Sequence, residues 1–213
     1  MTPRLWLVTD RRLVPDVTAA ARRALAVLPP TGCAIVLREK DLPTRDLMAL
    51  ATALRRLTRD RGARLVVSGR LDIALASDAD AVHLGFEAPP AAAVRRVVGE
   101  ALNVGVSLHG EEQAPAEADY AFLSPVFATT SKPGATPLGL GGLRRGVSRS
   151  SIPVVALGGI DASRIAACLA AGAAGVALRS GWLDVDDSAL EAIGRALGEA
   201  FAQAPVAAAV TRH

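Results

Sequence analysis

His109 is the residue of this sequence whose chemistry best suits proton transfer, because an imidazole titrates near neutral pH. It lies in the stretch VGVSLHGEEQ, two residues after the expected strand 103–107 and ahead of an expected helical stretch. His213 ends the chain, and His83 in AVHLG is expected to pack against the neighbouring strands. The local sequence leaves open whether His109 is an acid-base group or a surface residue.

Two turns of the sequence could bind a phosphate. The run VVALGGI ends in Gly158 and Gly159 before a helical stretch, and the run ALRSG places Arg179 and Ser180 after another apolar segment. Glycine lets backbone N–H groups approach an anion closely, and a helix N-terminus favours negative charge. We therefore expect these four residues to bind phosphate, although the glycines could also serve only to make tight turns.

Other apolar runs are also followed by polar side chains. In VLREKD, alternation places Arg38 and Lys40 on the same side, so both cations would point at a ligand if that side faces an interior. The segment PVFATTSKPG, residues 125–134, is long enough to fold over a ligand, unless it is simply a solvated surface loop. The predicted ligand-binding residues are Arg38, Lys40, Ser107, Thr129, Ser131 and Lys132.

Eight short apolar runs alternate with amphipathic helical stretches, as expected for parallel strands buried on both faces. This alternation predicts a single-domain α/β fold, a (β/α)8 TIM barrel over residues 1–204, with a frayed tail at residues 205–213. An open doubly wound sheet is the alternative, although no GxGxxG motif follows the first strand. The expected strands are 5–9, 34–38, 65–67, 81–84, 103–107, 120–123, 154–157 and 175–178.

The composition of the chain excludes several classes of protein. Of 213 residues, 51% are hydrophobic and 21% are charged, so the chain is globular. A net charge of +3 suits a phosphorylated small substrate, and only 3% aromatic residues argues against a nucleic-acid partner. The chain has no apolar run of membrane-spanning length and no signal-peptide pattern, which predicts a cytoplasmic protein without a membrane partner. Cys33 and Cys168 are isolated and match no metal or redox spacing.

Seven motifs of the chain resemble those of thiamine phosphate synthases and their TenI-like relatives, in the family's order and spacing. The resemblance implies a (β/α)8 barrel that handles thiazole phosphates in thiamine biosynthesis. The motifs are LVTD (7–10), LREKD (37–41), GRLDIAL (69–75), DAVHLG (80–85), VGVSLH (104–109), ADYAFLSPVFATTSKPG (118–134) and IPVVALGGI (152–160).

The synthase branch of this family implies a reaction that joins a thiazole phosphate to a pyrimidine pyrophosphate, with Mg2+ held by acidic side chains. Its pattern has Asn-Asp after the third strand, where this chain has Ser68-Gly69. Its pattern after the fourth strand is Gln and an acidic pair, where this chain has Phe86-Glu87-Ala88, and its Gln before the LREKD segment is Val36. Glycine and alanine cannot ligate a metal, so we predict no metal site and no cofactor.

The remaining pattern is similar to that of the TenI-like thiazole tautomerases. Ser68-Gly69-Arg70 of this chain resembles the Asn-Gly-Arg signature that those proteins carry after the third strand. The resemblance implies that a carboxythiazole phosphate becomes aromatic by a proton shift, with His109 as the acid-base group. Arg38 and Lys40 would then hold the substrate carboxylate. Ser68, in place of Asn, and the bulky Arg179 depart from the pattern. The alternatives are a Mg2+-dependent thiamine phosphate synthase and a non-catalytic, regulatory thiazole-phosphate-binding protein, and the sequence leaves association into homo-oligomers open.

Overall fold

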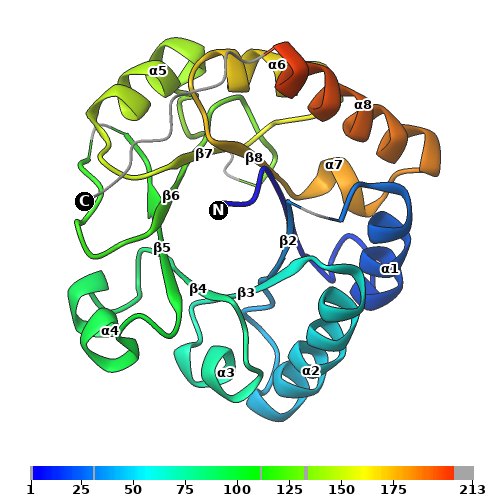
Figure 1. Cartoon of the computed structure of the whole chain (residues 1–213), viewed down its shortest axis with the longest axis vertical. Helices are drawn as coiled ribbons and strands as arrows, with labels where there is room; N and C mark the ends of the chain where they lie inside the picture. Colours follow the sequence, from blue (N-terminus) through cyan, green and yellow to red (C-terminus); the bar gives the residue numbers. More distant parts are fainter. Residues whose placement is uncertain (1, 31, 111, 132–133, 204–213) are drawn as a thin grey trace.

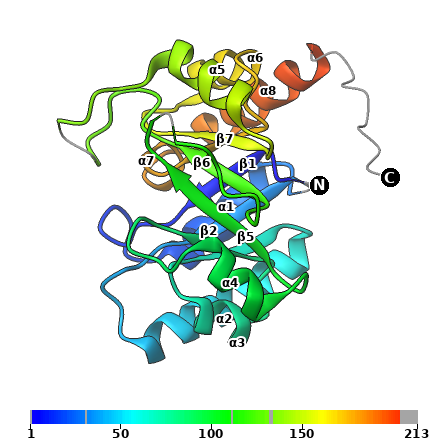
Figure 2. The same cartoon turned by 90° about the vertical axis from the view of Figure 1, so that its left-hand side faces the viewer.

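The chain folds into a closed barrel of eight parallel strands, and helices surround the barrel (Figures 1 and 2). This computed structural model describes residues 2–30, 32–110, 112–131 and 134–203. Neighbouring strands pair in chain order, and β8 returns to β1, which excludes the open sheet considered as the alternative. The strands are β1 Leu5–Val8, β2 Cys33–Leu37, β3 Arg64–Ser68, β4 Ala81–Leu84, β5 Asn103–Leu108, β6 Tyr120–Leu123, β7 Val154–Leu157 and β8 Gly175–Leu178.

The helices cover the outer face of the barrel, and all eight predicted strands are confirmed with boundaries that shift by one residue or less. Within the described residues no helix separates β5 from β6, so the helical stretch expected after His109 is wrong. Gly110 and Pro115 both disfavour helix in that connection. The helices are α1 Val17–Val27, α2 Thr44–Arg61, α3 Leu71–Ala76, α4 Ala91–Val98, α5 Gly139–Arg149, α6 Ala162–Ala170, α7 Ser180–Leu183 and α8 Asp187–Gln203.

Each strand is apolar on both faces because one face meets the helices and the other fills the barrel. In β1, Leu5 and Leu7 belong to the large core between strands and helices, whereas Trp6 and Val8 belong to the core inside the barrel. The two faces therefore bury different sets of side chains along one continuous apolar run. Among the described residues, no helix is both long and apolar enough to cross a membrane.

A layer of aromatic rings fills the middle of the barrel. The Trp6 ring lies 4.5 Å from the Tyr120 ring and 5.1 Å from the Phe122 ring, measured between centroids. Tyr120 pairs in register with Gly105 of the neighbouring strand, and a Cβ atom at Gly105 would overlap the Tyr120 ring. Gly105 is therefore required by close packing inside the barrel rather than by its backbone conformation.

Replacement of Gly105 by alanine tests this packing. We expect Gly105→Ala to destabilise the protein by about 1–3 kcal/mol in urea unfolding, because the added methyl group overpacks the interior. The same change at Gly198 is a matched control, since Gly198 is exposed on α8 and a Cβ there meets no atom within 4 Å. Gly198→Ala should be neutral or stabilise by up to about 1 kcal/mol through helix propensity. Equal effects of the two changes would contradict the packing role of Gly105.

Candidate active site

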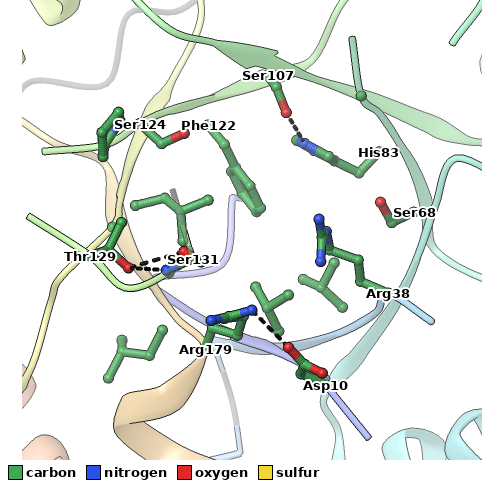
Figure 3. A pocket seen from close by; sticks show the side chains of 18 of the residues that line it. Asp10, Arg38, Ser68, His83, Ser107, Phe122, Ser124, Thr129, Ser131 and Arg179 are labelled. Carbon is green, nitrogen blue, oxygen red and sulfur yellow. Dashed lines mark hydrogen bonds and ion pairs between the residues drawn. The ribbon is translucent and has the colours of Figure 1, made fainter. Parts of the chain in front are cut away.

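A cavity of about 430 Å³ opens at the carboxyl ends of the strands (Figure 3). This end of a parallel barrel carries the active site in enzymes of the fold, and the volume suits a small molecule. The structure brings together around this cavity every predicted site residue that it describes, while Lys132 lies outside the described residues. These residues are Arg38, Lys40, Ser107, His109, Thr129, Ser131, Gly158, Gly159, Arg179 and Ser180.

The turn after β7 has a structural reason for its two glycines. Gly158 and Gly159 have φ angles of +103° and +63°, in the region that glycine favours. A Cβ atom at Gly158 would lie 2.9 Å from the Cα atom of Pro125, and one at Gly159 would overlap the carbonyl oxygen of Ala128. The loop after β6 thus packs directly on this turn, and phosphate binding by the two glycines stays a prediction.

Arg179 points into the cavity beside these turns and is held there by Asp10 (Figure 3). The Arg179 guanidinium donates to an Asp10 carboxylate oxygen at 2.7 Å, and the other oxygen accepts from the backbone N–H of Arg12 at 3.0 Å. Asp10 is buried and is missing from the predicted site. The position of Asp10 directly after the first strand could have indicated that it belongs to the site, because closure of the barrel places β1 beside β8.

The other carboxylates that line the cavity also contact an arginine. Glu39 is buried and accepts from the backbone N–H of Arg11 at 3.1 Å, while the Arg11 guanidinium lies 3.3 Å from the Asp41 carboxylate. Arg38 points toward the middle of the cavity, and its backbone N–H donates to the Thr9 hydroxyl at 3.0 Å (Figure 3). Arginines therefore already engage the acidic groups of this mouth, whereas the Arg38 guanidinium faces the cavity.

The described residues do not fit the magnesium ion that the synthase reaction implies. Ser68 at the end of β3 and Gly85 and Phe86 after β4 line the cavity, and none of them carries a carboxylate, while Glu87 is exposed outside the lining. Nowhere in the described ranges do three His, Cys, Asp or Glu side chains gather closely enough to hold a metal ion. Arg70 also lies outside the lining, where it pairs with Asp72 at 2.5 Å.

His109 lies on the loop after β5, where two contacts position it. Its Nδ1 atom lies 3.2 Å from the Ser124 carbonyl oxygen, which can only accept, so a neutral ring carries its proton on Nδ1 and its lone pair on Nε2. The backbone N–H groups of His109 and Gly110 donate to Glu112 at 2.9 and 2.7 Å. Burial alone would raise the pKa of Glu112, but these backbone donors lower it below its ordinary value. Glu112 is a second residue that the predicted site missed.

His83 is buried at the floor of the cavity, as its apolar surroundings in the sequence indicated. Its hydrogen-bond partner is the side chain of Ser107. Its Nε2 atom lies 2.9 Å from the Ser107 hydroxyl oxygen, and its ring lies 4.3 Å from the Phe122 ring between centroids. Burial, together with the nearby charge of Arg38, lowers the pKa of His83 from 6.5 to about 3. His83 is therefore neutral near physiological pH.

The chain belongs to the thiamine monophosphate synthase family, whose model matches residues 5–182. A putative thiamine-phosphate synthase of Geobacter sulfurreducens is 47% identical over 183 residues, which are 83% of this chain and 84% of that protein. The thiamine-phosphate synthase of Roseiflexus sp. is 41% identical over 210 residues, 94% of this chain and 86% of that protein. The expected family is thus confirmed.

A solved structure of thiamine phosphate pyrophosphorylase from Pyrococcus furiosus superimposes with a TM-score of 0.81 and 35% identity. The match covers 92% of this chain and 96% of that chain, so the complete barrel is shared. The names of these proteins support an enzyme of the synthase type. They favour the synthase, the alternative of the sequence analysis, over the tautomerase.

The buried His83 predicts a pH dependence of stability. Its folded pKa lies below its unfolded pKa, so between pH 6.5 and pH 3 the unfolded chain binds one proton more than the folded chain. Protonation of this residue in the unfolded chain therefore lowers the free energy of unfolding by about 2 kcal/mol when the pH falls from 7 to 5. In urea unfolding, we expect the free energy of unfolding of His83→Leu to fall by that much less over the same pH range. An identical pH dependence in the variant and the unchanged protein would contradict the neutral, buried histidine.

Proposed function

We propose that the cavity binds a thiazole phosphate, with the phosphate at the turns after β7 and β8. Backbone N–H groups at Gly158 and Gly159, the Ser180 hydroxyl and the Arg179 guanidinium supply donors of the kind that phosphate requires. Asp10 keeps the guanidinium in place at 2.7 Å before a ligand arrives. Thr129 and Ser131, whose hydroxyl oxygens lie 3.0 Å apart, face the same space from the loop after β6.

We propose that the reaction at this site is a metal-free tautomerisation of a carboxythiazole phosphate. The observation that carries this proposal is the combination of His109 at the cavity with turns after β3 and β4 that offer no carboxylate. His109 Nε2 takes the proton from the ring carbon that bears the carboxylate, and the C–H electron pair moves into the ring. The protonated His109 then delivers a proton to the outer carbon of the exocyclic double bond, whose electron pair forms the new C–H bond, so protons and charge balance and the ring becomes aromatic.

Arg38 and Lys40 support this step by electrostatics. Both line the cavity from the end of β2, and their positive charges stabilise the carboxylate and the negative charge that develops beside it when the proton leaves. His83 lies near Arg38 and stays neutral, so the positive charge that faces the ligand from this side comes from the end of β2. No cofactor is needed for a proton shift. A cytoplasmic location remains part of the same proposal.

The second candidate is the thiamine phosphate synthase reaction, which the names of relatives at 41% and 47% identity favour. Magnesium would neutralise the pyrophosphate leaving group in that reaction. Gly69 and Ala88 stand where the family pattern places acidic ligands, and for this reason we rank the tautomerase first. A third candidate is a non-catalytic protein that binds thiazole phosphate and uses the same cavity without turnover.

Turnover of the non-aromatic carboxythiazole phosphate, followed with and without EDTA, tests the proposal. We expect aromatic product at the same rate in both conditions, and no thiamine phosphate from thiazole phosphate and pyrimidine pyrophosphate with Mg2+. Magnesium-dependent coupling would instead establish the synthase, and absence of both reactions would leave the binding protein.

Two variants of His109 test its role in the proton shift. His109→Ala and His109→Asn should each lower kcat by about 100-fold or more while the Kd of the aromatic product stays within about twofold. The asparagine amide can still donate to the Ser124 carbonyl but cannot carry a proton at neutral pH. Unchanged kcat in either variant would reject His109 as the acid-base group.

A further inference from the structure

His83 and Ser107 form a buried polar pair between the cavity and the aromatic layer of the barrel. His83 faces inward from β4 and pairs in register with Gly105 of β5, so Ser107, two residues further along β5, projects on the same face. The ring of His83 is enclosed by Phe122 at 4.3 Å and Tyr120 at 5.8 Å between centroids. Both His83 and Ser107 line the cavity (Figure 3).

A histidine at position 83 is unfavourable for the stability of the fold. His83 is 5% exposed, and its Nδ1 atom is buried without a hydrogen-bond partner. A buried polar atom without a partner costs free energy, whereas an apolar side chain of similar size would fill the same space without that cost. The bond to Ser107 is thus the feature that distinguishes histidine from leucine here.

The burial of Nδ1 also determines the direction of the bond to Ser107. In a neutral ring one nitrogen carries a proton and the other accepts, and a buried N–H without an acceptor is rarer than a buried acceptor without a donor. The proton therefore belongs on Nε2, which donates to the Ser107 oxygen at 2.9 Å. Because the Ser107 oxygen accepts this bond from His83, its own O–H proton can be donated toward the cavity.

We propose that His83 is a positioning residue that makes the Ser107 hydroxyl a fixed hydrogen-bond donor to the ligand. The ligand atom it meets is an acceptor at the heterocycle end, because Ser107 stands on β5 whereas the predicted phosphate turns follow β7 and β8. Ser107 precedes His109 by two residues on the same side of the chain, so the acceptor lies beside the group that moves the proton. This inference rests on the proposed thiazole phosphate ligand.

A double-mutant cycle tests the proposal, with the aromatic carboxythiazole phosphate as the probe and its Kd measured by calorimetry. We expect His83→Leu and Ser107→Ala each to raise Kd about tenfold, and the double variant to raise it by about the same factor. His83→Gln, whose side-chain N–H can reach the Ser107 oxygen, should stay within about threefold of the unchanged protein. Multiplicative losses in the double variant, or an unaltered Kd in His83→Leu, would overturn the positioning role.

Two controls separate this role from a structural one and from the proposed function. Inorganic phosphate should bind the single variants and the unchanged protein equally, because its site is at the turns after β7 and β8. His83→Leu should be no less stable than the unchanged protein at pH 5, whereas a purely structural histidine predicts lower stability without the tenfold change in Kd.

The double-mutant cycle needs no turnover, so binding without tautomerisation would reject the proposed reaction alone. Failure of the unchanged protein to bind the probe would overturn both.

Discussion

Closure of the barrel is the constraint on which the rest of this structure depends. Residues Leu5–Leu7 of β1 pair with residues Val176–Leu178 of β8, and this pairing leaves the sheet without an open edge. A closed sheet needs an interior filled by side chains, which Trp6, Tyr120 and Phe122 supply. It also brings the carboxyl ends of all eight strands to one mouth, so polar residues far apart in sequence surround one cavity.

The two ends of the barrel use charged groups differently. At the amino ends of the strands, Asp80 and Asp119 each accept from a backbone N–H of the neighbouring strand and from an arginine of an outer helix, at 2.6–2.7 Å. These contacts connect helices to strands. At the carboxyl ends, Asp10 holds Arg179 toward the cavity, while the Arg38 side chain also points into it. Charge at one end connects helices to strands, and charge at the other end faces the cavity.

Membership of the family accounts for the barrel, but the fold does not determine which residues occupy the turns at its mouth. The match over residues 5–182 and the shared superposition show that the frame is that of thiamine monophosphate synthases. Gly69 and Ala88 leave that frame intact, since they follow β3 and β4 in turns that need no carboxylate to fold. The residue types at these two positions therefore do not affect the fold, because strand pairing and core packing do not depend on them.

The eight strands and the described cavity residues from Arg38 to Ser180 could be predicted from the sequence, because apolar runs with polar ends reflect burial that is local to each strand. The choice between a closed barrel and an open sheet needed the pairing of β8 with β1. The tertiary structure alone decided the contacts across strands. Asp10 meets Arg179 because β1 and β8 close the sheet, and His83 meets Ser107 because β4 and β5 pair in one register. Such partners are 169 and 24 residues apart along the chain, so no periodicity within a segment can indicate them.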